Sequence, residues 1–157
     1  GVGSFSYAMN SLNKSKLDKF IINQSKKRKP IIGICLGMQL LTNNSEEGGM
    51  YKGLGIIPGK IEELECSDFH IGWNNIEVNE NISFIKKFNN HEFFFNHGYA
   101  YKGNNKNVLS TTKYGNNYFA SAIFKGSTVG FQFHPEKSQK AGLQILKSTI
   151  NYLIKNK

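Results

Sequence analysis

A cysteine between two glycines is the first feature of this sequence that could do chemistry. Cys35 lies in the stretch Gly33-Ile34-Cys35-Leu36-Gly37, and a G-x-C-x-G pattern is typical of a turn tight enough to present the middle side chain. Such a thiol would lie at the start of a helix, where the helix dipole and free N–H groups lower a cysteine pKa. The Leu36 N–H would then face an oxyanion beside the sulfur. The alternative is a buried structural cysteine.

A histidine and a glutamate two residues apart could complete this site. A thiol nucleophile needs a base, and the base needs a group that orients it. His134 and Glu136 are separated only by Pro135, and side chains two apart in an extended chain point to the same side. The carboxylate could therefore accept from one imidazole nitrogen and leave the other for the thiol. Alone, H-P-E is common in surface turns; together with Cys35 it indicates a catalytic triad.

Two short strands would bring these residues together. Residues 31–34 are apolar on both faces, as in a parallel strand covered by helices, and residues 36–41 have the apolar spacing of a helix. Residues 129–133 predict a second strand, which ends at His134. Since open parallel sheets carry their sites at the carboxyl ends of the strands, we expect Cys35 and His134 at one edge of an α/β sheet.

The remaining sequence predicts further helices and strands around this sheet. Residues 7–22 predict helix, and residues 108–112 and 118–124 predict an antiparallel pair around Gly115. The C-terminal stretch predicts an amphipathic helix over residues 142–154. Its expected inward side chains are Leu143, Leu146, Ile150, Leu153 and Ile154. No linker or repeat interrupts the chain, so we expect one domain over residues 1–157.

Composition narrows the class of protein. The chain has 157 residues, of which 39% are hydrophobic, and no apolar run is long enough to span a membrane. Two cysteines make no disulfide framework, which favours a cytoplasmic location. The net charge of +9 could indicate nucleic-acid binding. However, the lysines are scattered and their one dense cluster, residues 26–29, has no aromatic side chains between them. We expect no nucleic-acid or membrane partner, and neither a metal nor a cofactor.

Several motifs together resemble one enzyme family. G-I-C-L-G-M-Q-L-L at residues 33–41 and F-Q-F-H-P-E-K-S at residues 131–138 resemble a class I (triad) glutamine amidotransferase. Residues 1–5 resemble the end of that family's P-G-V-G-x-F oxyanion strand. Residues 53–59 and the H-I-G-W-N stretch at residues 70–74 narrow the resemblance to the glutaminase subunit of imidazole glycerol phosphate synthase, from histidine biosynthesis. The resemblance covers the whole chain.

The resemblance implies a three-layer α/β domain with a mostly parallel central sheet, here without the family's first strand and helix. It also implies that Cys35 attacks the side-chain amide of glutamine, that His134 acts as base and then acid, and that Glu136 orients His134. The backbone N–H groups of Val2 and Leu36 would form the oxyanion hole. The implied glutamine-binding residues are Gly3, Gln39, His97, Gly98 and Tyr99.

A partner is implied as well. By similarity, Trp73, Asn74 and Lys137 belong to the face that docks a cyclase (β/α)8-barrel subunit, which receives the ammonia in a heterodimer. Several of the assigned residues have a simpler alternative role. Trp73 could be a core residue, Lys137 an ordinary surface lysine and His97 a core histidine. Cys66 has no histidine or helix start nearby and is interpreted as having no role in the site.

Departures from the family pattern leave other functions open. The turn at residues 96–99 reads Asn-His-Gly-Tyr, and Phe94 stands where the family commonly has tyrosine. These differences could point to a paralogue that supplies ammonia to an N-acetyl-sugar amidotransferase. A catalytically idle binding subunit and a cysteine peptidase on the same fold are further alternatives. Cys35, His134 and Glu136 argue against the first of these two, and Gln39 argues against the second.

Overall fold

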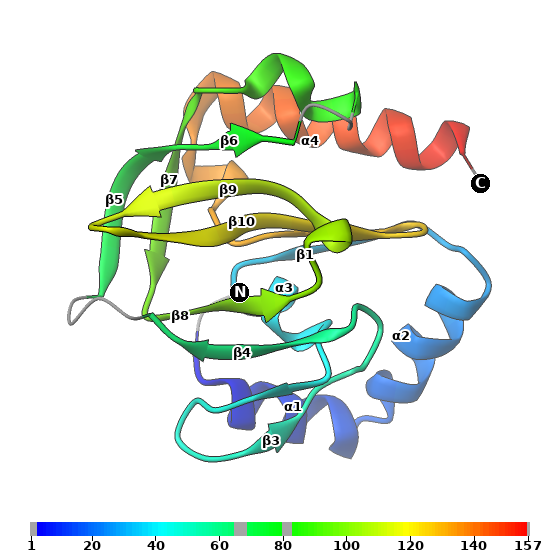
Figure 1. Cartoon of the computed structure of the whole chain (residues 1–157). Helices are drawn as coiled ribbons and strands as arrows, with labels where there is room; N and C mark the ends of the chain where they lie inside the picture. Colours follow the sequence, from blue (N-terminus) through cyan, green and yellow to red (C-terminus); the bar gives the residue numbers. More distant parts are fainter. Residues whose placement is uncertain (1–2, 65–68, 80–82, 157) are drawn as a thin grey trace.

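The computed structural model describes residues 3–64, 69–79 and 83–156 (Figure 1). Its α-helices are α1 (Phe5–Lys14), α2 (Leu17–Lys26), α3 (Leu36–Leu40) and α4 (Gln139–Lys155). The short 3-10 helices are η1 (Ser83–Phe88), η2 (Asn105–Asn107) and η3 (Pro135–Lys137). The strands are β1 (Ile31–Ile34), β2 (Asn44–Ser45), β3 (Tyr51–Lys52), β4 (Gly59–Glu63), β5 (His70–Asn75), β6 (Glu77–Val78), β7 (Glu92–His97), β8 (Tyr99–Gly103), β9 (Val108–Tyr114), β10 (Asn117–Lys125) and β11 (Thr128–Phe131).

Most strands form one mixed sheet. Its main order is β1-β11-β10-β8-β4-β2-β3; off this path, β9 pairs with β10, and β6 pairs with β9. The α/β class is confirmed, but the expected mostly parallel sheet is corrected. Within the described residues, only β1–β11 and β2–β4 pair in parallel. The reason is that short turns connect β9, β10 and β11, and tight turns join antiparallel strands.

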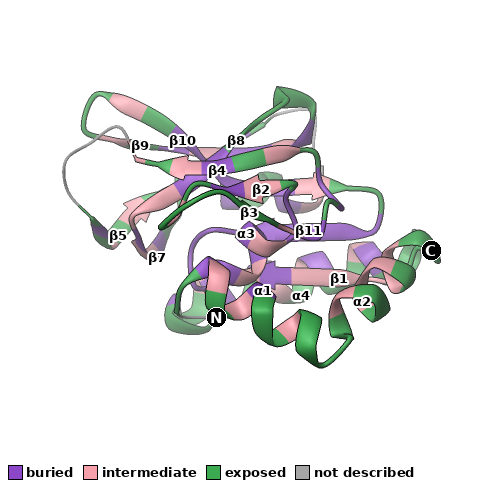
Figure 2. Ribbon diagram, turned by 90° about the horizontal axis from the view of Figure 1, so that it is seen from below, coloured by how far each residue is buried: buried purple, intermediate pink, exposed green. Residues whose placement is uncertain are grey.

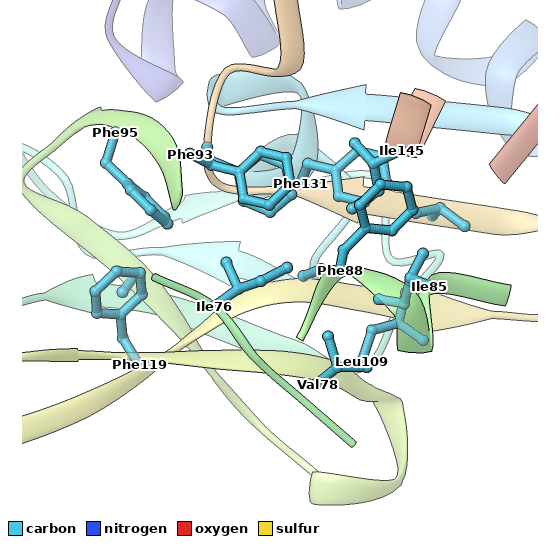
Figure 3. Packing of buried hydrophobic residues seen from close by; sticks show 14 of the residues in the cluster. Ile76, Val78, Ile85, Phe88, Phe93, Phe95, Leu109, Phe119, Phe131 and Ile145 are labelled. Carbon is cyan, nitrogen blue, oxygen red and sulfur yellow. The ribbon is translucent and has the colours of Figure 1, made fainter. Parts of the chain in front are cut away.

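Helices cover both faces of the sheet around β1 and β11. Figure 1 shows α4 and η1 on one side and α1 to α3 on the other. The first side has an aromatic core, seen closely in Figure 3, in which Phe93 stacks on Phe133 with ring centroids 4.3 Å apart. The second core contains Phe5 of α1 and Met38 of α3, both fully buried. Cys35 directly precedes Leu36 of the second core, and His134 directly follows Phe133 of the first.

The C-terminal helix is rotated from the expected face. Of the five expected inward side chains, Leu153 is buried and Leu146 packs against the core, whereas Leu143, Ile150 and Ile154 are 69%, 44% and 55% exposed. Ile145 and Thr149 are buried in their place. Gly142 explains this rotation, because a Cβ there would lie 1.8 Å from the Pro135 carbonyl oxygen. The helix therefore packs closely against η3. Among the described residues, no helix is both long enough and apolar enough to span a membrane.

A second, two-stranded sheet crosses one end of the molecule. It pairs β5 with β7, and Figure 1 shows both strands running across the direction of β8 to β10. Alternate residues of β5 point outward, and Figure 2 shows that this end carries exposed and half-buried residues. Because β7 lies between β5 and η3, this small sheet connects the outer surface to the candidate site.

Candidate active site

Cys35 occupies the turn between β1 and α3, as the glycine pattern predicted. Its backbone has φ 50° and ψ −111°, a conformation that strains any residue with a Cβ. The strand and helix approach so closely that a Cβ at Gly33 would lie 2.6 Å from the Gly37 carbonyl oxygen. A Cβ at Gly37 would meet nothing within 4 Å. Close packing therefore requires glycine at position 33 but not at position 37.

The thiol of Cys35 is buried and hydrogen-bonded. Its side chain lies 3.7 Å from the carbonyl oxygen of Asn96, to which the S–H can donate, and Gln132 Nε2 donates to the sulfur at 3.7 Å. Burial raises the pKa of Cys35, although the Leu36 N–H opposes this by stabilising the thiolate. The expected lowering of the thiol pKa is therefore wrong: loss of hydration outweighs the short helix behind it. The thiol needs a base.

His134 has the arrangement of such a base. Its Nδ1 lies 2.7 Å from Glu136 Oε1, and its ring is 1% exposed. Burial, the largest single influence, would raise the pKa of Glu136, but the hydrogen bond from His134, a backbone hydrogen bond and nearby positive charge together lower it. The ionised carboxylate accepts from Nδ1–H, which leaves a lone pair on Nε2. Among the described residues, this buried Nε2 has no hydrogen-bond partner, the Cys35 thiol included.

Strand β7 holds the nucleophile and the base on its free edge. The His134 N–H donates to the Phe94 carbonyl oxygen at 2.8 Å, and the Phe94 N–H donates to Ser138 Oγ at 2.9 Å. Ser138 Oγ in turn donates to the His134 carbonyl oxygen at 2.6 Å. Two residues further along β7, Asn96 provides the carbonyl that faces Cys35. One strand thus fixes both halves of the site.

A cavity of about 180 Å³ opens beside the thiol. It is smaller than the roughly 300–1,000 Å³ of sites for drug-sized ligands, as suits a substrate the size of an amino acid. The structure brings all the expected substrate residues to its wall. The lining residues are Gly3, Cys35, Leu36, Gln39, Glu47, Phe69, Asn96, His97, Gly98 and Tyr99. Val2 and Cys66 lie outside the described residues.

Trp73 and Lys137 share an exposed surface at the edge of this site. Trp73 is 45% exposed, and its ring packs edge-on against Phe94 at 6.1 Å between centroids. The Lys137 ammonium lies 5.7 Å from the centroid of the same Phe94 ring. Ile71, on the same face of β5 as Trp73, is 64% exposed. Asn74 differs, because its side chain turns inward and donates to the Lys113 carbonyl oxygen at 2.9 Å.

The sequence interpretation assigned no role to Gln132 or Asn96, both of which contact the thiol. Gln132 is completely buried, and its Oε1 accepts from Gln39 Nε2 at 3.2 Å. A glutamine in an otherwise apolar strand was the available signal, because a buried amide needs partners. The described residues contain no group of three or more His, Cys, Asp or Glu side chains that could hold a metal ion.

Comparisons with known proteins agree with this geometry. Residues 1–151 match the model of the family described as "Glutamine amidotransferase class-I". Among solved structures, "Structure of PurLQS from Thermotoga maritima" matches with a TM-score of 0.68 at 21% identity, covering 88% of this chain and 68% of that one. A second, "Crystal structure of glutamine amidotransferase", matches with a TM-score of 0.71 at 14% identity, covering 94% and 75%. At these identities the structures show the fold.

Curated relatives narrow the family. The chain is 40% identical over 153 residues to "Imidazole glycerol phosphate synthase subunit HisH" of Chlorobaculum tepidum, covering 94% of this chain and 76% of the relative. The HisH subunit of Listeria innocua is 39% identical, with 94% and 72% covered. The Arabidopsis thaliana "Imidazole glycerol phosphate synthase hisHF, chloroplastic" is 38% identical, with 94% and 26% covered. The chain belongs to the HisH family of class-I glutamine amidotransferases.

Proposed function

We propose that this protein hydrolyses L-glutamine to glutamate and ammonia as the glutaminase subunit of an imidazole glycerol phosphate synthase, with Cys35, His134 and Glu136 as its catalytic triad. The observation that carries the proposal is the state of His134. One ring nitrogen is bound to a carboxylate, and the other is buried with no partner among the described residues. A neutral imidazole held in this way is ready to accept a proton.

The reaction begins with proton transfer from the Cys35 thiol to His134 Nε2. The thiolate then attacks the side-chain amide carbon of glutamine, and negative charge develops on the amide oxygen. The Leu36 N–H, which already stabilises the thiolate, and the Val2 N–H donate to this oxyanion. Collapse of the intermediate transfers the proton from His134 to the leaving ammonia, and water then cleaves the thioester to give glutamate.

The cavity residues have distinct parts in this proposal. His97, Gly98 and Tyr99 line the same cavity as Cys35 and bind the amino-acid end of glutamine, together with Gly3. Gln39 lines the same cavity, and its amide nitrogen donates to the Tyr99 carbonyl oxygen at 3.1 Å. Gln39 therefore fixes the position of the Tyr99 backbone as well as contacting the substrate.

The ammonia passes to a cyclase (β/α)8-barrel subunit that docks on Trp73, Asn74 and Lys137 as the other half of a heterodimer. The relatives are named as subunits of a synthase. An exposed tryptophan beside a lysine is typical of an interface anchor, and Phe94 connects this face to His134 through the backbone of β7.

The test is to measure glutamate release by the protein with and without a cyclase barrel subunit and its acceptor substrate. Cys35→Ala should abolish release while the circular dichroism spectrum stays unchanged. A glutamine analogue carrying an electrophile should modify Cys35 and leave Cys66 free, as read by peptide mass spectrometry. Undiminished release by Cys35→Ala, or modification at Cys66 instead, would contradict the assignment.

A further inference from the structure

Two buried histidines outside the triad are in direct contact. His70 of β5 and His97 of β7 are opposite one another in the strand register, each 3% exposed. His70 Nδ1 lies 3.4 Å from His97 Nε2, and the His70 ring stacks on Phe95 at 4.8 Å between centroids. Burial lowers the pKa of both rings, that of His97 to about 3. Both are therefore neutral near pH 7, and each carries one N–H.

The outer end of this pair fixes one tautomer. Asn74 Nδ2 lies 2.9 Å from the Lys113 carbonyl oxygen, and Asn74 Oδ1 accepts from the Asn75 N–H at 2.8 Å. These two contacts define which end of the amide is nitrogen. The same Nδ2 lies 3.4 Å from His70 Nε2, which must accept because an amide nitrogen only donates. A neutral His70 then carries its proton on Nδ1 and donates to His97.

The inner end requires the same direction independently. His97 Nδ1 lies 2.8 Å from the Tyr99 carbonyl oxygen, which can only accept. His97 Nδ1 is therefore protonated, and its Nε2 must accept from His70. Starting from Asn74 or from Tyr99 gives the same answer, so the hydrogen bonds from Asn74 through His70 and His97 to the Tyr99 carbonyl all run in one direction.

The chain continues to the nucleophile. The Tyr99 carbonyl oxygen also accepts from Gln39 Nε2 at 3.1 Å, and the same nitrogen donates to Gln132 Oε1 at 3.2 Å. Gln132 Nε2 then donates to the Cys35 sulfur at 3.7 Å. An uninterrupted series of polar contacts thus runs from Asn74, beside the exposed Trp73, to the thiol.

The contacts in this chain are not equally tight. The bonds that anchor it to backbone carbonyls, at Lys113 and Tyr99, are 2.9 and 2.8 Å long. Both contacts made by His70 are 3.4 Å, beyond the usual 2.7–3.2 Å range of N–H hydrogen bonds. Of these two, only the His70–His97 contact joins β5 to β7, so a small displacement of β5 changes that distance.

We propose that His70 is a positioning residue, which transmits the position of the docking strand β5 through His97, Tyr99, Gln39 and Gln132 to Cys35. This inference rests on the proposed function, because it assigns a role in partner stimulation to the same site. Docking on Trp73 presses β5 toward β7, shortens the contact between His70 and His97 and favours one arrangement of the Tyr99 carbonyl and the Gln132 amide. The site is thereby biased toward its active geometry.

The series of hydrogen bonds from Asn74 to Cys35 can be tested without any activity assay. Nitrogen-15 and carbon-13 NMR of the histidine rings should find both His70 and His97 protonated at Nδ1, and partner addition should shift the His70 Nδ1–H resonance. In Asn74→Asp, which has the same shape, a carboxylate faces His70 Nε2 and must accept. His70 should then become protonated at Nε2. A wild-type Nε2–H tautomer at either ring, or unchanged His70 resonances in Asn74→Asp, would overturn the proposal.

The coupling is tested by kinetics at saturating partner. His70→Phe keeps the ring stack but removes both nitrogens, and should lower the stimulation of glutamate release by about 2- to 30-fold. His70→Asn places an amide nitrogen near Nδ1 and should restore much of the loss. His91→Phe is the matched control, since His91 is exposed and takes no part in these hydrogen bonds. Stimulation equal to wild type in a folded His70→Phe protein would overturn the coupling.

The two proposals fail in different ways. If wild-type protein releases no glutamate with any partner, the proposed function is wrong, and the tautomers still decide whether the chain exists. If His70→Phe does not fold, Asn74→Asp still measures stimulation at saturating partner against the wild-type factor, and wild-type stimulation in that variant would refute the coupling. A reduced factor at saturating partner supports it.

Discussion

Glu136 Oε1 lies 2.7 Å from His134 Nδ1, and this contact determines which nitrogen of the imidazole is free. His134→Ala removes the base and should lower kcat for glutamate release by about 10²–10⁴. Glu136→Ala leaves the base but loses its orientation, so the loss should be smaller. Rates are compared at saturating glutamine with the partner present. A larger loss in Glu136→Ala than in His134→Ala would contradict these roles.

The two glycines that flank Cys35 should differ in their tolerance of alanine. At Gly33 a methyl group would lie 2.6 Å from the Gly37 carbonyl oxygen, so the strand and helix must separate. We expect Gly33→Ala to lower the free energy of unfolding by about 1–3 kcal/mol. At Gly37, inside α3, a methyl group meets nothing within 4 Å, and alanine favours a helix by up to about 1 kcal/mol.

Urea unfolding of the two variants provides the measurement, and each serves as the other's control. Equal stability of Gly33→Ala and Gly37→Ala would show that the close approach of strand and helix is not what requires glycine at position 33.

Stability should fall as the solution is acidified, because His97 is buried in its neutral form. Burial lowers the pKa of His97 to about 3, whereas a histidine in the unfolded chain binds a proton near pH 6.5. Between these values only the unfolded state takes up this proton. The free energy of unfolding therefore decreases by up to about 1.4 kcal/mol per pH unit as pH falls from about 6.5 toward 3.

His70 contributes in the same direction, since burial also lowers its pKa. His97→Gln should therefore reduce the slope rather than abolish it. Urea unfolding between pH 6.5 and 5 is the appropriate measurement. In that range Glu136, whose pKa is lowered, stays ionised and adds nothing to the slope. An identical slope in wild type and His97→Gln would contradict the buried neutral state.

The free protein should be nearly idle without its partner. If one oxyanion donor is turned away until docking, the lost donor costs roughly 10²–10³ in rate, so the complex with acceptor should be at least about a hundredfold faster. Lys137 contacts Phe94, whose carbonyl holds His134. Lys137→Ala should therefore weaken stimulation more than it weakens the basal rate.

Trp73→Ala should raise the dissociation constant of the complex about tenfold or more, as expected for an aromatic anchor that is exposed in the free protein and becomes buried on docking. Titration calorimetry of the partner measures this constant. The dissociation constant of Trp73→Ala is compared with that of Ile71→Ala, a matched substitution on the same exposed face of β5. Equal glutamate release with and without partner and acceptor would rule out gating, even with Cys35 as the nucleophile.

The sequence predicted those parts of the site that depend on local sterics. The turn at Cys35 and the hairpin around Gly115 follow from glycines within a few residues, and both are confirmed. The mostly parallel pairing expected for the whole sheet was wrong, because it depends on distant pairing partners. The inward face of α4 was wrong in part, although Leu153 is buried as predicted, for a related reason. Leu143 and Ile154 lie on an exposed apolar face of α4, beside the face that Ile145 and Leu153 bury. The close approach of Gly142 to Pro135 determines which of the two faces turns inward.

The role of Gln132 could not be predicted from its neighbours in the chain. The glutamine is recognisable as an unusual residue in an apolar strand, but its partners come from two other segments. Cys35 is 97 residues away in sequence and Gln39 is 93 residues away. Periodicity identifies a strand, whereas the contacts that surround a buried amide are known only once the strands are paired.

The backbone conformation at Cys35 lowers the stability of the protein, although the cysteine itself is needed for catalysis. A residue with a Cβ at φ 50° is strained by of order 1–3 kcal/mol, and glycine in the same place is not. A Cys35→Gly protein would therefore melt at a higher temperature than the native enzyme while lacking its nucleophile. In a lineage released from selection for glutamine hydrolysis, selection for stability alone would favour glycine here. A relative with glycine at this position would thus be a catalytically inactive protein that became more stable when it lost its nucleophile.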